Sequence, residues 1–470
     1  MSMRLLASRC LVLTAFCGAA ANDAQKMGFS HLGAEFGAYE VDASGGIKLG
    51  GVKKGGNRLG YPLGGEWRLA LDPAKAGAKE KWHEKLPGQA TVRLPGTLDE
   101  AGIGEPGKPS VSTLTRKYEY IGMAWYQRDV DIPDAWRGKT VQLWLDRVMW
   151  ESRLYVDGKL VGSEDSLCTP HVYELGVLSP GKHVVTLRID NSGRPGANCH
   201  GYGDDIQIKW NGVVGRMELI ARDAVYVASL RTIPDMANKR VRVLTKIANE
   251  TGRSIEGELA LSARVRNEKE TIGKSRNWFK VAGKEALVEL TISLDKNWKP
   301  WDEFSAALYE VESTVTAECE GEAFRDVSTT RFGMRELGQA GTQFTMNGRT
   351  IFLRGTHDGI GFMLTGHPAG DEESWRRVFK TCKAYGLNHV RYHSVCPNGP
   401  AFLAADEEGI ILQPELPVWA SIKEDWAGQA FLQRELERIL EFYGNSPSFC
   451  MFSMGNEHAG NWDFLGRLGE

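Results

Sequence analysis

The chain has 470 residues, of which 42% are hydrophobic and 25% are charged, and its formal net charge is −3. This length suggests roughly three domains. A nearly balanced charge provides no electrostatic attraction to nucleic acid or to an anionic membrane surface, so neither is expected as a partner.

Residues 1–21 have the pattern of a secretory signal peptide. Arg4 and Arg9 supply a basic start, residues 11–16 form a short apolar core, and Ala19–Ala21 offers a small-residue cleavage site. The apolar core is too short to span a bilayer. The pattern therefore predicts a secreted or periplasmic protein with no membrane contact after signal removal. The alternative is a cytosolic chain with an apolar N-terminus.

Six cysteines follow this segment, and none forms a CxxC pair or another zinc-ligand spacing. No structural zinc site and no cofactor are therefore predicted. Cys168 and Cys199 are candidates for a disulfide in an oxidising compartment. Cys382 and Cys450 lie in apolar runs and are expected to be core thiols.

The first two-thirds of the chain predict an arm followed by two all-β domains. Residues 22–60 are rich in glycine and poor in large apolar side chains, which is typical of a linker. Residues 61–222 consist of short alternating runs separated by turns, including a hairpin signal at Asp157-Gly158, and predict a jelly-roll sandwich. Residues 223–335 contain further strand-like runs and have the size of an immunoglobulin-like sandwich.

Residues 336–470 alternate between strand and helix signals. Asp371 is expected to cap the first helix, which carries an apolar stripe, and Gly386 to end it. Four β-α steps in succession predict a parallel sheet covered by helices. The expected strands are Ile351–Leu353, residues 387–393, residues 410–414 and Phe449–Phe452. The expected later helices run around Phe402–Glu408 and through Leu432, Leu436, Ile439, Leu440 and Tyr443.

The fourth of these strands is followed at once by Asn456 and Glu457. A carboxylate at the edge of a low-dielectric interior has the setting that raises a pKa enough for general-acid chemistry near neutral pH. The alternative is an Asn helix cap followed by a first-turn Glu, a purely structural role.

Polar side chains follow all four expected strands. In a (β/α)-barrel the chemistry is built at the carboxyl ends of the strands, so this pattern favours a functional site. The histidines show no HExxH or comparable spacing, so no metal is predicted. The polar residues at the strand ends are Arg354, His357, Asp358, Arg391, His393, Glu415, Trp419, Asn456 and Glu457.

These domains and motifs resemble glycoside hydrolase family 2, which includes β-galactosidases, β-glucuronidases and β-mannosidases. The segments that carry the resemblance are LGGEWRLALDP, LPGTLDEAG, AWYQRDVDIP, residues 298–309, RFGMRE, MNGRTIFLRGTHD, YGLNHVRYHSVCP, QPELPVW and FSMGNEH. The resemblance implies a jelly roll, an immunoglobulin-like sandwich and a TIM barrel, of which this chain would hold the first half.

The resemblance also implies roles for individual residues. Glu457 corresponds to the acid/base catalyst, Asn456 to the partner of the substrate 2-hydroxyl and Arg391 to the residue that orients the nucleophile. His393 is expected near the sugar hydroxyls. Asp358, Glu415 and Trp419 complete the expected substrate-binding set.

The chain departs from the family pattern in two places. It has RYHSVCP where the family has Arg-x-Ser-His-Tyr-Pro, which leaves the counterpart of that histidine open. PELPVWAS does not reproduce the acidic metal ligands of some β-galactosidases, so no magnesium ion is expected. In the family the nucleophilic Glu lies on the seventh barrel strand, beyond Glu470. Residues 22–470 expressed alone are therefore expected to be inactive and poorly soluble.

The main functional hypothesis is a retaining exo-β-glycosidase of the β-galactosidase kind, acting on a carbohydrate substrate. The alternatives are a β-glucuronidase or β-mannosidase of the same family, or a non-catalytic carbohydrate-binding protein. In the last case Trp144 or Trp150 of the first sandwich would hold the glycan, although their alternation within strands favours core packing. The sequence does not indicate an oligomeric state.

Overall fold

The structure is a computed structural model. It describes residues 40–41, 47–48, 52–54, 58–107, 117–193, 199–203, 209–360, 362, 364–422 and 428–469. The predicted signal peptide and most of the predicted arm lie outside these residues. The last three residues of that arm, Arg58–Gly60, already belong to a strand of the first sandwich. No helix in the described part is long and apolar enough to cross a membrane.

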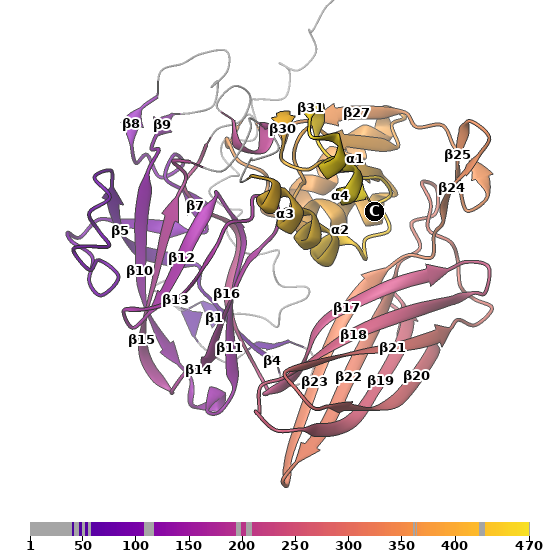
Figure 1. Cartoon of the computed structure of the whole chain (residues 1–470), viewed down its shortest axis with the longest axis horizontal. Coiled ribbons are helices and arrows are strands. Elements are labelled where there is room, and N and C mark those ends of the chain that lie inside the picture. Colours follow the sequence, from indigo (N-terminus) through magenta and orange to yellow (C-terminus); the bar gives the residue numbers. More distant parts are fainter. Residues whose placement is uncertain are drawn as a thin grey trace, which may run out of the picture.

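The first domain is a sandwich of two antiparallel sheets (Figure 1). Alternating side chains such as Trp67, Tyr126, Leu143 and Leu219 are buried between the sheets, as expected for strands with one face toward a core. One sheet runs in the order β13 (Lys159–Glu164), β12 (Glu151–Val156), β15 (Gly181–Asp190), β10 (Met123–Ile132), β5 (Gly65–Asp72), β6 (Thr91–Leu94). The other runs β14 (His171–Val177), β11 (Thr140–Val148), β16 (Gly212–Arg222), β4 (Arg58–Pro62), β3 (Val52–Lys54), with β7 (Gly96–Thr97) also on β16.

Short elements accompany this sandwich. Asp157 and Gly158 both have positive φ and join β12 to β13, which confirms the predicted hairpin turn. The remaining elements are the pairs β1 (Glu40–Val41) with β2 (Ile47–Lys48) and β8 (Glu105–Pro106) with β9 (Tyr118–Glu119), and the 3₁₀ turns Asp134–Trp136 and His200–Tyr202.

The second domain is a seven-stranded antiparallel sandwich at the lower right of Figure 1. The strand-like runs predicted in residues 223–335 lie in strands, and their alternating apolar residues form a separate core. One sheet contains β17 (Val225–Asp235), β18 (Arg240–Asn249) and β21 (Glu285–Ser293). The other contains β20 (Thr271–Val281), β19 (Ile255–Val265), β22 (Tyr309–Cys319) and β23 (Glu322–Phe332).

The third part begins with a small antiparallel sheet and continues with parallel strands and helices. Asp371 caps α1 by accepting a hydrogen bond from Ser374 N, and Gly386 follows the helix with φ +75°, both as predicted. The antiparallel strands are β24 (Leu337–Ala340), β25 (Gln343–Met346) and β26 (Arg349–Thr350). The parallel strands are β27 (Gly355–Asp358), β28 (His389–Tyr392) and β29 (Ile411–Gln413), and then the pair β30 (Trp419–Ile422) and β31 (Asn456–Gly460). The helices are α1 (Glu372–Ala384), α2 (Gly399–Glu408), α3 (Gly428–Tyr443) and α4 (Trp462–Gly469).

Two predicted strands are wrong in position. At 351–353 Phe352 is 76% exposed, and β27 begins only at Gly355. The side chain of Asn388 bonds the backbone on both sides of this segment, to Phe352 O and Arg354 N, and so takes the place of a ladder partner.

The segment 449–452 is likewise not a regular strand. It has an isolated parallel bridge at its first residue, Phe449, and another follows it at Ser453. The side chain of Arg335 donates a hydrogen bond to the carbonyl of Phe449 at 2.7 Å. The regular strand β31 starts only at Asn456. On α3, Leu440 is 39% exposed rather than buried, because it lies at the border of the apolar face.

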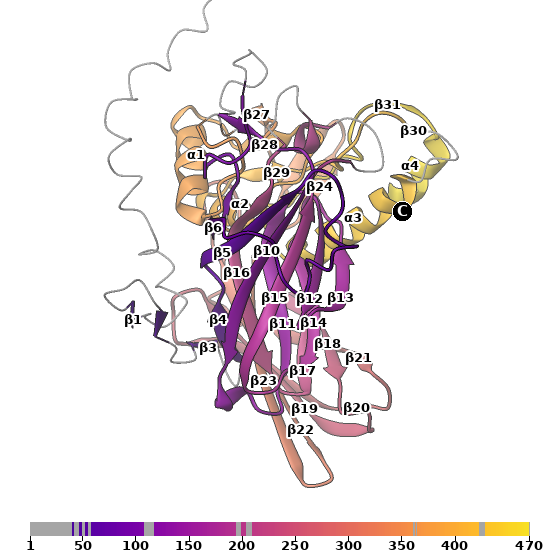
Figure 2. The same cartoon turned by 90° about the vertical axis from the view of Figure 1, so that its left-hand side faces the viewer.

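Some residues of the first sandwich, outside the core between its sheets, form a second hydrophobic core with the helical part, and Figure 2 shows the helices at one end of the molecule. Glu435 on α3 is fully buried, and its Oε1 accepts hydrogen bonds from Ser166 Oγ and from the backbone N–H groups of Leu167 and Cys168, at 2.8–3.1 Å. Tyr443 also donates to the carbonyl of Cys168. These contacts fix residues 166–168 of the first sandwich against α3.

Candidate active site

Arg391 connects the ends of three parallel segments. From the end of β28 its Nε donates to Glu415 Oε1 at 2.6 Å and its Nη2 to Asn456 Oδ1 at 2.8 Å. Glu415 is fully buried, and its Oε2 accepts a hydrogen bond from the backbone N–H of Ser394 at 2.7 Å. A buried carboxylate is tolerated when it is paired in this way, and the pairing fixes the orientation of the guanidinium. The structure thus brings together three residues that the sequence placed at the ends of three different strands.

Glu457 lies on β31 beside Trp419 of the neighbouring strand β30. Trp419 Nε1 donates to Glu457 Oε2 at 2.5 Å. Glu457 is exposed, which differs from the predicted place at the edge of a buried interior. The helix-cap alternative is wrong, because α4 begins only at Trp462 and Asn461 Oδ1 accepts the capping hydrogen bond from Phe464 N.

Three non-glycine residues around these strand ends have left-handed backbone conformations. They are Ile360 (φ +59°) after β27, Ser394 (φ +49°) after β28 and Glu457 (φ +48°) on β31. Such conformations cost of order 1–3 kcal/mol each and persist only where the surroundings fix them, as they often do at functional sites. Asp358 helps to fix the first loop, since its Oδ1 accepts from Ile360 N and its carbonyl from His393 N.

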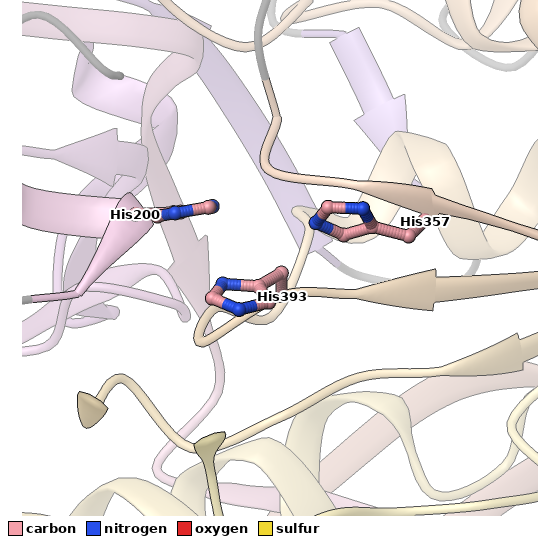
Figure 3. Close-up of side chains that lie close together, drawn as sticks. All are labelled: His200, His357 and His393. Atoms are coloured by element: carbon pink, nitrogen blue, oxygen red, sulfur yellow. The ribbon is translucent and has the colours of Figure 1, made fainter. Parts of the chain in front are cut away.

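His393 lies in a cluster with His357 of β27 and with His200 of the first sandwich (Figure 3). The ring centroid of His393 is 4.1 Å from that of His200 and 5.0 Å from that of His357. Burial lowers the pKa of His393, His357 and Arg391 lower it further, and Glu415 opposes the shift. Trp419 meets the cluster edge-on, with its ring centroid 5.1 Å from that of His393.

His200 had no signal in the sequence. It lies 157 residues before His357, in a different domain, and reaches the strand ends only because the sandwich packs against them. Arg354, at the other end of β27, lies away from this group and bonds to Gly386 O and Glu303.

Two family models match the chain. The sugar binding domain of glycosyl hydrolases family 2 matches residues 61–193, and a second model, described as glycosyl hydrolases family 2, matches residues 225–335. Together the matches cover more than half of the chain. The chain belongs to glycoside hydrolase family 2.

Curated relatives of this family 2 chain include a β-galactosidase of Thermoanaerobacter pseudethanolicus, 22% identical over 76% of the chain and 47% of the relative. A β-glucuronidase of Paenibacillus borealis is 23% identical over 84% of the chain and 67% of the relative. The chain thus spans about half the length of the first of these enzymes. Among solved structures, a β-glucuronidase of Bacteroides uniformis aligns with a TM-score of 0.70 at 18% identity, over 84% of the chain and 46% of the neighbour, which confirms a multidomain, mostly β fold.

The aromatic residues considered for glycan binding in this family 2 chain are packed between domains. Trp150 is 6% exposed and meets Phe431 edge-on at a centroid distance of 6.1 Å, and Trp144 meets Phe442 in the same way at 5.6 Å. Trp144 is half-buried and has the guanidinium of Arg216 over its ring, 4.6 Å from the centroid, so both positions disfavour the carbohydrate-binding alternative. No disulfide joins Cys168 to Cys199, the predicted candidates, in the described part of the chain.

Proposed function

We propose that this chain contributes the acid/base catalyst and the sugar-contacting side chains of a retaining exo-β-glycosidase. The observation that carries the proposal is the Asn456–Glu457 pair on β31, held by Arg391 on one side and by Trp419 on the other. Support comes from relatives named β-galactosidase and β-glucuronidase, and from neighbouring structures named β-glucuronidase.

The surroundings of Glu457 suit proton transfer to a bound sugar. Its exposure leaves the carboxyl accessible to a glycosidic oxygen, and the hydrogen bond from Trp419 holds Oε2 while Oε1 remains for the substrate. In a retaining mechanism such a residue first protonates the leaving oxygen and then, as a carboxylate, activates the water that releases the sugar.

Arg391, Glu415 and Asn456 act on this reaction through orientation. Asn456 directs its Oδ1 to Arg391, so its amide N–H groups can donate to the substrate 2-hydroxyl. Both carboxylate oxygens of Glu415 already accept hydrogen bonds, one from Arg391 and one from Ser394 N. This fits a positioning role for Glu415 rather than nucleophilic attack. The nucleophile, expected about 5–5.5 Å from the acid/base in a retaining enzyme, is not assigned to any described residue.

The same proposal includes the fold type of each domain, the location of the protein and its substrate. The first domain is a jelly roll, the second is immunoglobulin-like, and the parallel strands are the first half of a TIM barrel whose carboxyl ends form the site. The protein is secreted or periplasmic. Its substrate is a terminal β-galactoside or β-glucuronide, since relatives of both kinds match the chain.

The test is replacement of Glu457 by alanine in the natural gene product, assayed with aryl β-galactosides and aryl β-glucuronides of graded leaving-group ability. Poor leaving groups should lose far more rate in glycosylation than activated ones, because they need the proton. Added azide should replace the missing base and restore turnover as a β-glycosyl azide. The control is Glu441→Ala, an exposed carboxylate on α3.

An equal loss of rate for all leaving groups without rescue by azide would assign Glu457 a structural role. Comparable turnover of both sugars would show that the site does not select at C4 and C6, the two carbons at which galactose and glucuronic acid differ.

A further inference from the structure

We propose that His200, His357 and His393 form a binding site for one divalent transition-metal ion of the zinc class, at the junction of the first sandwich and the parallel strands. The inference does not depend on the proposed glycosidase activity. It rests on the meeting of three imidazoles from three separate segments (Figure 3).

The distances bring all three side chains within reach of one ion. Each histidine offers one ring nitrogen, and these nitrogens all lie within 4.8 Å of one another. Zinc binds imidazole nitrogen at about 2.0–2.1 Å, so a tetrahedral ion needs nitrogens roughly 3.3 Å apart. Closing this difference requires side-chain rotation, which the exposed His357 and the half-buried His393 allow more readily than the buried His200.

The backbone around the three histidines is fixed before any ion binds. His393 N donates to the carbonyl of Asp358, the residue after His357, at 2.8 Å. His200 N donates to Ser394 Oγ at 3.3 Å, so the sandwich loop is tied to the residue after His393. Hydrogen bonds between the segments therefore set the relative positions of the ligands, a preorganisation that favours metal binding.

Two glycines allow His200 to come this close. A Cβ at position 359 would lie 2.6 Å from His200 Nδ1, and a Cβ at position 201 would lie 2.7 Å from Val395 Cγ2. Neither distance is compatible with a side chain unless the neighbours move. The approach of the sandwich loop to the strand ends thus depends on having no side chain at either position.

The donor set selects the class of ion. Three neutral imidazole nitrogens suit zinc and its neighbours, whereas magnesium and calcium prefer oxygen. The contact of Ser394 Oγ with His393 Nδ1 at 3.1 Å occupies one nitrogen of that ring and leaves Nε2 for the ion. Three protein ligands leave a fourth position for water, and Trp419 lies beside the cluster, with its ring centroid 5.3 Å from that of His200.

The test measures metal uptake by the full chain, purified without a polyhistidine tag and dialysed against trace Zn²⁺. We expect one equivalent of zinc per chain by elemental analysis, and a ligand-field spectrum of four-coordinate Co²⁺ after substitution. His357→Ala should weaken binding by roughly a hundredfold or more. Because His357 is exposed, this variant is expected to fold.

The control is His183→Ala, since His183 pairs with Asp157 at 2.7 Å far from the cluster in the first sandwich. It should bind zinc as the unaltered chain does. His393→Ala provides a second variant and should lose the Co²⁺ spectrum. The proposal is overturned if the chain takes up no stoichiometric zinc, or if uptake by His357→Ala and His393→Ala equals that of the control.

Discussion

Replacing Asp406 by asparagine should stabilise the protein at mildly alkaline pH and have much less effect at acidic pH. Asp406 lies on α2 with 1% of its surface exposed, and its Oδ1 accepts a hydrogen bond from Ser448 N at 2.9 Å. Its Oδ2 is buried and has no partner within regular hydrogen-bond geometry among the described residues. Burial raises the pKa of this carboxyl from 3.8 to about 7, and the hydrogen bonds from Ser448 and the charge of Arg331 oppose that rise.

The sign and size of the effect follow from this pKa. The folded state holds the proton more tightly than the unfolded chain does, so the stabilising contribution is complete below pH 3.8 and is lost as the pH rises to about 7. At about 1.4 kcal/mol per pKa unit, the full loss in the free energy of unfolding is roughly 4 kcal/mol. Since asparagine does not titrate, the advantage of Asp406→Asn should grow by about 2–3 kcal/mol between about pH 5 and pH 8.

The assay is urea denaturation at both pH values, followed by tryptophan fluorescence. The chain has 14 tryptophans, so the emission reports its overall unfolding, whose free energy is the quantity that the pKa shift changes. Glu441→Gln, which alters an exposed carboxylate, should show no such pH-dependent gain. An advantage of Asp406→Asn that is equal at the two pH values, or larger at pH 5, would refute the reasoning.

Two further substitutions test the contacts that hold the first sandwich against the third part of the chain. Glu435→Ala removes the acceptor for one hydroxyl and two backbone N–H groups in residues 166–168, at about 1–3 kcal/mol for each buried donor. Glu435→Gln keeps an acceptor oxygen and should lose less stability in urea denaturation; equal losses would contradict this role. Gly359→Ala should displace His200 and weaken zinc binding in equilibrium dialysis by roughly tenfold or more. Gly283→Ala, with no atom within 4 Å of the added Cβ, should bind as the unaltered chain does, and equal affinities for the two variants would refute the steric argument.

Much of the fold could be predicted because burial leaves a local periodic pattern. The strands of both sandwiches and the cap and stripe of α1 follow from alternation and from 3.6-residue spacing within a dozen residues. The error at residues 351–353 arose because the side chain of Asn388 replaces the regular backbone partner. That contact has no signature near the strand that it interrupts.

The sequence by itself determined which polar groups stand at the strand ends, because parallel strands carry their carboxyl ends to one edge. Arg391, Glu415 and Asn456 could be grouped for that reason. Only the tertiary structure decided that Glu457 is exposed and that His200 joins His393 from another domain. Periodicity reports which face of an element is buried, whereas contacts between residues nearly 200 positions apart depend on which folded surfaces fit together. That fit rests on glycines 201 and 359 and on the buried acceptor Glu435, whose effect exists only once both domains have folded.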